Sequence, residues 1–253
     1  APSKRSYRAY ARASEPKRQE LLRRLNQLHG GTQRLVSMRQ DLLRMMHDDP
    51  TLEPLDVDFG HLFRSWFNRG FLELRPINWS SPAEVLEKII AYEAVHAIAS
   101  WDDLRRRLQP TDRRCFGFFH PAMPDEPLIF VEVALIQGIP NSIQTLLVDG
   151  RDPIDAEDAD TAVFDSISNC QSGLAGVSFG NSLIKQVVAD LSQELSALKT
   201  FVTLSPIPGL AKWLAATDAP ALANASVEAR AAHYLLEAKR EDRQPQDPVA
   251  RFH

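Results

Sequence analysis

The sequence predicts an α+β protein in which an all-helical N-terminal part precedes a larger part that mixes helices with strands. Apolar residues recur at three- and four-residue steps over 20–46, which is typical of amphipathic helices. Two continuous apolar runs, 128–135 and 161–168, are typical of buried strands. From this change of pattern along the chain we expect a helical domain over 1–69 and a second domain over 70–253.

The composition indicates a folded chain without a disulfide framework. Of the 253 residues, 44% are hydrophobic and 25% are charged, which is enough apolar material for a sizeable core. The two cysteines, Cys115 and Cys170, are too few for a disulfide-rich secreted scaffold or a thiolate-rich metal site. No apolar run approaches the roughly 18–20 residues of a membrane span, and the first residues form no apolar signal core. We therefore expect a soluble, cytoplasmic protein.

The N-terminal part carries a leucine stripe and an excess of positive charge. The net charge is +6 over residues 1–50 and −10 over the rest of the chain. Because the arginines alternate with leucines at helical spacing, the charge fits the polar face of a helix. A nucleic-acid footprint is the alternative, but no binding motif accompanies the charge. The stripe breaks at Gly30 and Gly31, and residues 1–67 cannot bury it alone. We expect it to form the interface of a homodimer or homotetramer.

The second part is expected to begin with an extended segment over 71–79. Ser80, Ser81 and Pro82 then predict a helix start, because a hydroxyl cap and a first-turn proline favour helix initiation. The other elements expected are a short helical face over 62–67, a helix over 101–108, strands over 114–120, 128–135 and 161–168, an acidic loop over 149–160, a helix over 183–198, a short strand over 201–204 and an alanine-rich helix over 221–238.

A glycine-containing loop between a strand and an amphipathic helix is the best local candidate for a binding site. Gly173, Gly176 and Gly180 follow the 161–168 strand and precede the next helix. Glycines let the backbone approach a ligand, and the first N–H groups of a helix favour pyrophosphate. The Gly-Lys-Ser/Thr of a P-loop and the spacing of the dinucleotide fingerprint are both missing. From spacing alone, a pyrophosphate site and an ordinary turning loop both fit.

Ser205 is a second candidate, because Pro206 and Pro208 directly after it hold the backbone stiff. A catalytic serine and a capping or turn serine both fit this position, and no Gly-x-Ser-x-Gly elbow supports a hydrolase triad. The seven histidines lack the spacing of metal ligands, so no metal site is expected. His96 and His120, near element ends, fit structural roles.

Five blocks of the sequence form a pattern when they are taken in order. They are Tyr-Glu-Ala-Val-His at 92–96, Glu-Pro-Leu-Ile at 126–129, the loop and helix start at 173–185, Ser-Pro-Ile-Pro-Gly at 205–209 and Asp-Pro-Val-Ala-Arg-Phe-His at 247–253. Together these blocks resemble the malonyl-CoA decarboxylase family. The similarity covers residues 71–253, and the helical region before them is also similar. It implies a helical bundle followed by an acetyltransferase-like (GNAT) α/β catalytic domain with a mixed sheet. It also implies conversion of malonyl-CoA to acetyl-CoA and carbon dioxide without a metal or organic cofactor.

The resemblance also implies roles for particular residues. Ser205 and His253 correspond to a catalytic pair that contacts the substrate, and Lys88 corresponds to a lysine implicated in activity. The loop on the coenzyme A pyrophosphate corresponds to Ala175, Gly176, Val177, Ser178, Phe179, Gly180 and Asn181. Some relatives carry an acidic residue where this chain has Ser178, so we expect backbone contact at that position.

The chain departs from the family in length. The stretch 212–228 is short for the family, relatives continue beyond His253, and the first residue is not methionine. We therefore expect that terminal residues, or residues within 212–228, are missing from this sequence.

The implied reaction passes through a thioester enolate. Backbone N–H groups near the loop would stabilise the charge on its oxygen, and His253 with Ser205 would handle the proton. The main rival is an N-acyltransferase on the same fold, which a carboxylate base facing an amine groove would favour. A non-enzymatic helical interaction protein is a further rival, against which the presence of both Ser205 and His253 argues. The expected partners are malonyl-CoA and acetyl-CoA rather than nucleic acid or a membrane, and the expected setting is fatty acid metabolism.

Overall fold

The computed structural model describes residues 3–148, 150, 152–177, 179–216 and 225–252. It begins with four helices, namely α1 (Lys4–Ser14), α2 (Lys17–Asn26), α3 (Gly31–Met45) and α4 (Glu53–Trp66), with short 3-10 turns η1 (Pro50–Leu52) and η2 (Arg69–Phe71) around α4. The break between α2 and α3 lies at the predicted glycine pair. A Cβ atom at Gly31 would lie 2.1 Å from the Leu25 carbonyl oxygen, so this sharp turn requires glycine.

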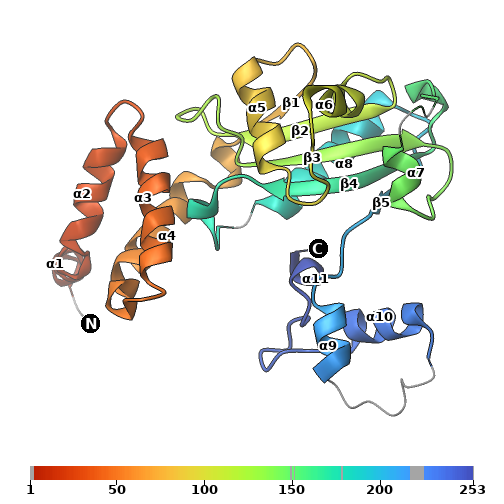
Figure 1. Ribbon diagram of the computed structural model, residues 1–253. Coiled ribbons are helices and arrows are strands. Elements are labelled where there is room, and N and C mark those ends of the chain that lie inside the picture. The colour runs from red at the N-terminus through yellow and green to blue at the C-terminus, as the bar shows by residue number, and fades with distance from the viewer. Residues whose placement is uncertain (1–2, 149, 151, 178, 217–224, 253) are drawn as a thin grey trace.

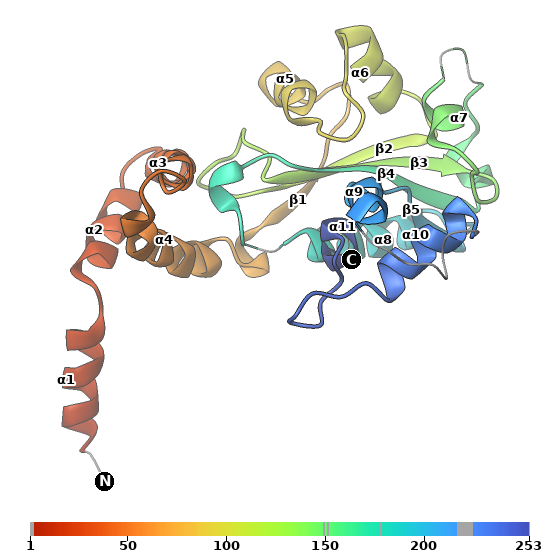
Figure 2. The ribbon, with the colours of Figure 1, turned by 60° about the horizontal axis from the view of Figure 1, so that its bottom comes forward.

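Two features of the helical part differ from the sequence prediction. The helical face expected over 62–67 is the end of a longer helix, because α4 already begins at Glu53. Helix α1 was not predicted; the Ser3 side chain caps it by accepting the Ser6 N–H at 3.2 Å. Figure 2 shows α1 projecting away from the other helices.

The second part is built on one five-stranded sheet in the order β1-β2-β3-β4-β5. The strands are β1 (Glu73–Pro76), β2 (Arg113–Phe119), β3 (Ile129–Ile136), β4 (Thr161–Asn169) and β5 (Thr200–Thr203). The first three pairings are antiparallel, and β5 pairs with β4 in parallel. Helix α8 (Gly180–Glu194) makes the crossover that a parallel pair needs. The α+β class and the mixed sheet are therefore confirmed, as are the four strands predicted after residue 113.

Helices cover both faces of the sheet (Figures 1 and 2). Helices α5 (Ala83–Tyr92) and α6 (Trp101–Leu108) lie on one face, and α8 lies on the other. Successive strand residues point to opposite faces: Phe130 of β3 packs in the cluster of α5 and α6, whereas Val131 packs in the cluster of α8. Burial on both faces explains why the strands are continuous apolar runs.

The remaining helices flank the sheet. Helix α7 (Ile143–Leu147) and the 3-10 turn η3 (Ala156–Asp158) lie between β3 and β4, and η3 interrupts the segment expected to be an acidic loop. After β5 come α9 (Leu210–Ala216), α10 (Val227–Leu236) and α11 (Pro248–Phe252), which group below β5 in Figure 1. The helix expected over 221–238 is wrong in its start, because Ser226 caps α10 by accepting the Ala229 N–H at 3.2 Å; residues 221–224 lie outside the described residues.

The helical part and the sheet part share one core. Leu35 of α3 and Phe63 of α4 belong to the same buried cluster as Phe118 of β2. The rings of Phe67 and His120 lie 5.0 Å apart across the same junction. The domain boundary at residues 69 and 70 stays a prediction. Among the described residues, no helix combines the length and the apolar character needed to cross a membrane.

Candidate active site

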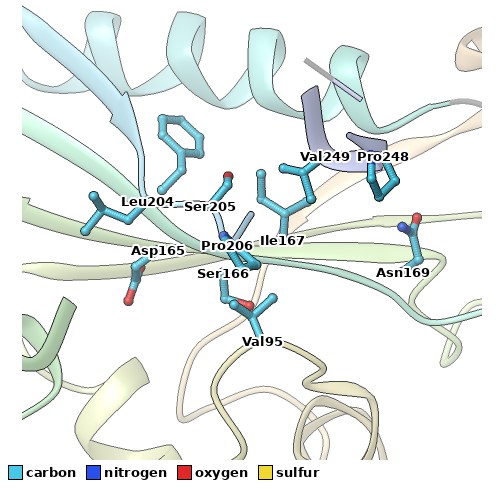
Figure 3. Close-up of a pocket in the computed structure, with 11 residues that line it drawn as sticks. Val95, Asp165, Ser166, Ile167, Asn169, Leu204, Ser205, Pro206, Pro248 and Val249 are labelled. Carbon is cyan, nitrogen blue, oxygen red and sulfur yellow. The ribbon is translucent and has the colours of Figure 1, made fainter. Parts of the chain in front are cut away.

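Ser205 lines a cavity of about 230 Å³ at the carboxyl end of β4 (Figure 3). Four segments that lie far apart in the sequence form it. The lining residues are Val95 after α5, Phe164, Asp165, Ser166, Ile167 and Asn169 of β4, Leu204, Ser205 and Pro206 after β5, and Pro248 and Val249 of α11. The structure thus brings the predicted serine together with the start of the helix that leads to His253. His253 itself lies outside the described residues.

The cavity opens where β4 and β5 separate. Their paired residues end at Phe164 and Thr203, and the last bond is donated by the Leu204 N–H to the Phe164 carbonyl at 3.0 Å. Pro206 has no N–H group and cannot continue the ladder. A β-bulge begins at the same place: Glu132 of β3 faces Ser166 but Val133 faces Phe164, so Asp165 is the extra residue. Bulges bend a strand and redirect its side chains, which is how β4 forms the floor of the cavity.

A buried carboxylate fixes the part of the cavity lining that α11 forms. Asp247 is fully buried, and its Oδ1 accepts the N–H groups of Val249 at 2.8 Å and Ala250 at 3.1 Å. Gly209, four residues after Ser205, approaches the buried Tyr234 so closely that a Cβ atom would lie 2.1 Å from its hydroxyl oxygen and 3.4 Å from Asp247 Oδ2. The turn after Ser205 and the start of α11 are therefore fixed against one another.

The glycine loop forms a second cavity, of about 510 Å³, in front of α8. Its lining runs along the chain through Asn169, Cys170, Gln171, Ser172, Leu174, Ala175, Gly176, Val177, Phe179 and Gly180. Gly176 has φ +78°, a left-handed conformation that glycine adopts without strain. The Phe179 side chain makes no capping bond to the first turn of α8. Asn169 lines both cavities, so the loop and the Ser205 cavity adjoin; Ser178 lies outside the described residues.

Lys88 does not line the Ser205 cavity. It lies on α5 with 17% of its side chain exposed, and its Nζ contacts Glu84 Oε1 at 2.7 Å, Glu126 Oε1 at 3.0 Å and the Asp125 carbonyl at 3.0 Å. Burial opposes the charge, but the bonds to Glu84 and Glu126 outweigh it and raise the pKa of Lys88. The residue is therefore placed to act through Glu126; its implication in activity stays a prediction.

The prediction missed a buried charged network behind β4. Arg113 on β2 lies 3.4 Å from Asp165, and Arg107 on α6 lies 3.3 Å from Glu132 on β3. Burial, together with the charges of Asp165 and Glu93, raises the pKa of Glu132 to about 8, although Arg107 opposes the shift. Burial also raises the pKa of Asp165, although Arg113 opposes it. A single charged residue inside an apolar strand run was the signal available in the sequence.

Glu93 connects this network to the cavity. Its Oε2 accepts the Ser166 hydroxyl at 2.6 Å, and its Oε1 accepts the N–H groups of Val95 at 2.7 Å and His96 at 2.8 Å. Ser166 and Val95 both line the Ser205 cavity. The glutamate of the Tyr-Glu-Ala-Val-His block therefore shapes two of the cavity walls.

No cluster of three or more His, Cys, Asp and Glu side chains that could hold a metal ion exists among the residues described. Cys115 and Cys170 are both free and buried, and burial raises the pKa of each thiol. Reactive cysteines need the opposite shift, so neither cysteine fits a nucleophile.

Most of the chain matches the models of one protein family. The model of the malonyl-CoA decarboxylase N-terminal domain matches residues 1–67, and that of the malonyl-CoA decarboxylase C-terminal domain matches residues 70–224. This chain belongs to the malonyl-CoA decarboxylase family. The resemblance seen in the five sequence blocks is confirmed.

Solved structures agree with this family over nearly the full chain. The malonyl-CoA decarboxylases of Rhodopseudomonas palustris and Agrobacterium vitis are each 52% identical to it, with TM-scores of 0.91 and 0.90, and the match covers 99% of this chain and 68% of each of theirs. The mitochondrial malonyl-CoA decarboxylases of Anser anser anser and Mus musculus are 43% and 40% identical over 79% of this chain. The chain spans only 40–42% of the length of these two relatives.

The Glu132 carboxyl gives a testable pH dependence of stability. With a pKa of about 8 when folded and an ordinary value of 4.5, Glu132 keeps a proton in the native state that the unfolded chain releases. Raising the pH from about 4.5 to about 8 therefore destabilises the fold through this group. Glu132→Gln imitates the neutral carboxyl at every pH. The difference in melting temperature between this variant and the parent chain should therefore increase from about pH 4.5 to about pH 8 and stay constant at higher pH.

Thermal melts from pH 5 to pH 9 measure this difference, with the exposed Glu87→Gln on the neighbouring α5 as a control that should follow the parent chain. A constant difference between Glu132→Gln and the parent chain at every pH would contradict a protonated Glu132.

Proposed function

We propose that this chain decarboxylates malonyl-CoA to acetyl-CoA and carbon dioxide without a metal or organic cofactor. One observation carries the proposal: Ser205 lies in a small cavity that adjoins, through Asn169, a glycine loop at the start of a helix. Membership of the malonyl-CoA decarboxylase family supports it. We also assign the chain, from the resemblance alone, to the cytoplasm and to fatty acid metabolism.

Substrate binding would use the two adjoining cavities. The pyrophosphate of coenzyme A fits the loop of residues 175–181, where glycine backbone and the first N–H groups of the 15-residue α8 favour an anion. The pantetheine arm would then run past Asn169, so that the malonyl group reaches the Ser205 cavity. This assignment needs no basic side chain at the loop.

The chemistry breaks the bond between C2 and the carboxylate carbon of the malonyl group. The electron pair of that bond moves into the thioester and leaves an enolate oxygen, while the carboxylate leaves as carbon dioxide. Backbone N–H groups at the loop or at the freed edge of β4 would stabilise the enolate oxygen. C2 then takes up one proton, which gives acetyl-CoA.

Ser205 and His253 would handle the carboxylate and the proton. The Ser205 hydroxyl would orient the malonyl carboxylate, and the His253 imidazole would supply the proton to C2 because its ordinary pKa lies near neutrality. Most of the cavity lining is apolar, with Val95, Ile167, Leu204, Pro206 and Val249. Removing the carboxylate from water in such a site favours its conversion to neutral carbon dioxide.

An acetyl transfer to an amine would need a free carboxylate base in the same cavity. Asp165 is the carboxylate that lines it, but its side chain is fully buried, lies 3.4 Å from Arg113 and points away from Ser205 in Figure 3. This arrangement favours decarboxylation over transfer. Incubating the protein with malonyl-CoA, with and without a primary amine, and measuring acetyl-CoA and acylated amine separates the two reactions; acylated amine without acetyl-CoA would overturn the proposal.

The proposed Ser205–His253 pair predicts a large loss of turnover when either residue is replaced. Ser205→Ala and His253→Asn should each lower the turnover number by about 10²–10⁴-fold, the usual contribution of general acid–base catalysis. Because groups that act as a unit are not additive, the double variant should lose little more than either single variant. Turnover at saturating malonyl-CoA measures this.

Ser226→Ala is the matched control, because Ser226 caps α10 and should affect stability rather than turnover. Melting temperatures of all four variants separate folding from catalysis. Near-parental turnover in a folded Ser205→Ala or His253→Asn variant would refute the pair.

The proposed role of the glycine loop predicts how a substitution there changes ligand affinity. Gly176→Val places a β-branched residue at φ +78°, a conformation that such residues avoid, so the loop must change shape. Calorimetry should show a weaker affinity for acetyl-CoA. Gly138→Val is the matched control: it creates the same strain at φ +72° outside both cavities, with no atom within 4 Å of the new Cβ in either case. Equal acetyl-CoA affinities of the two variants would remove the loop from the binding site.

For assembly, we propose a homodimer or homotetramer that forms through the N-terminal helices. Tyr7 and Tyr10 of the projecting α1 are 70% and 71% exposed, and Leu21 of α2 and Leu28 after α2 are also exposed. Burying such side chains against a second copy would be favourable. Light scattering at micromolar concentration should show a dimer or tetramer, and Tyr7→Ser with Tyr10→Ser should reduce its mass, whereas the exposed Leu236→Ser on α10 should not. A monomeric parent chain would contradict the proposal.

A further inference from the structure

One buried arginine of the helical part reaches the glycine loop. Arg39 lies on α3, and its Nη1 donates to the carbonyl oxygens of Gly173 at 2.9 Å and Ala175 at 2.8 Å. Only 6% of the Arg39 side chain is exposed. Hydrogen bonds from an ionised donor are stronger than neutral ones, and burial removes water as a competitor.

The other side of the Arg39 guanidinium group contacts residues of the helical part. Its Nε donates to Asp56 Oδ1 of α4 at 2.8 Å, and its Cζ lies 5.9 Å from the centre of the Phe63 ring. The planar fork is therefore oriented by α4 before it meets the loop. A lysine ammonium at this position could not make these three bonds with the same geometry.

The loop also rests directly on the backbone of α3. A Cβ atom at Gly173 would lie 2.0 Å from the Val36 carbonyl oxygen, and 3.0 Å from a Val36 methyl carbon. Position 173 therefore has to be glycine for the loop to approach the helix. Contact with α3 and the two Arg39 bonds fix the loop at neighbouring positions.

A second polar tie fixes the start of the loop. Glu126 accepts from Gln33 of α3 at 2.9 Å and from Gln171, the residue before the 3-10 turn η4 (Ser172–Leu174), at 3.2 Å. Lys88 holds the same carboxylate at 3.0 Å. The segment that leads into the loop is thus connected to both α3 and α5.

We propose that Arg39 is a positioning residue for coenzyme A, which sets the shape of the pyrophosphate loop from the helical part of the chain. In a planar trans peptide the carbonyl and the following N–H point in opposite directions. Turning the Ala175 carbonyl toward Arg39 therefore turns the Gly176 N–H away from α3, and Gly176 lines the loop cavity. The inference rests on the proposed coenzyme A site but assigns a residue outside it.

The test compares two ligands that differ in the pyrophosphate. Calorimetry measures acetyl-CoA and acetyl-pantetheine, which lacks the pyrophosphate and the nucleotide, on the parent chain and on Arg39→Lys. If the competent loop shape falls to about a tenth of the population, acetyl-CoA affinity falls about tenfold. We expect that loss for acetyl-CoA only, with the turnover number at saturating malonyl-CoA nearly unchanged.

Arg18→Lys is the matched control. Arg18 makes an ion pair of 2.7 Å with the buried Asp58 of α4 and does not contact the loop, so this variant should keep the parental preference for acetyl-CoA. Should Arg39→Lys fail to fold, Asp56→Asn takes its place, because it loosens the same guanidinium from the partly exposed side.

Each outcome decides between the possibilities. A loss confined to acetyl-CoA supports the inference. An unchanged preference in Arg39→Lys, or an equal loss for both ligands, overturns it, because the arginine would then have no role or only a general structural one. A parent chain that binds both ligands equally well would instead overturn the proposed coenzyme A site, and with it the role of Arg39.

Discussion

The separation of β5 from β4 is the constraint on which the candidate site depends. Parallel pairing ends at Phe164 and Thr203, and Pro206 prevents its continuation because it has no N–H group. The same short stretch therefore places Ser205 beside the free edge of β4 and leaves room for a substrate. The bulge at Asp165 adds to this, since it ends the regular alternation of β4 where the strand begins to line the cavity. If the edge strand β5 paired with β4 along the whole length of β4, it would fill this space.

The helical part supports the candidate site through its contacts with the glycine loop. Its residues share one apolar core with the sheet, and Gly173 approaches the α3 backbone without room for a side chain. Arg39 then donates hydrogen bonds to two loop carbonyls, those of Gly173 and Ala175. Tyr7 and Tyr10, by contrast, are exposed on α1, which projects away from the other helices (Figure 2).

The sequence predicts most of the fold because local patterns carry it. Apolar runs bounded by turn residues locate β3 and β4, and caps such as Ser100 locate α6 to the residue. Ser205 and the glycine loop are found because prolines and glycines mark them. Arg39 is not found, because Gly173 lies 134 residues away and nothing local distinguishes this arginine from its surface neighbours. Asp165 stands out as a charge within its strand run, but its partner Arg113 lies 52 residues away and cannot be identified from the sequence. The start of α10 is misplaced because an alanine-rich stretch has helical propensity on both sides of the Ser226 cap.

The charged network behind β4 has a consequence for a negatively charged substrate. The pKa of about 8 keeps Glu132 protonated below that pH, while the guanidinium groups of Arg107 and Arg113 contact Glu132 and Asp165. A proton on Glu132 therefore lowers the negative charge behind the floor of the cavity, which would reduce repulsion of the malonyl carboxylate proposed to bind there. Above that pH an added buried negative charge on β3 lies opposite Ser166, which lines the cavity. The protonation state of Glu132 therefore affects both the stability of the sheet and the electrostatics of the candidate site.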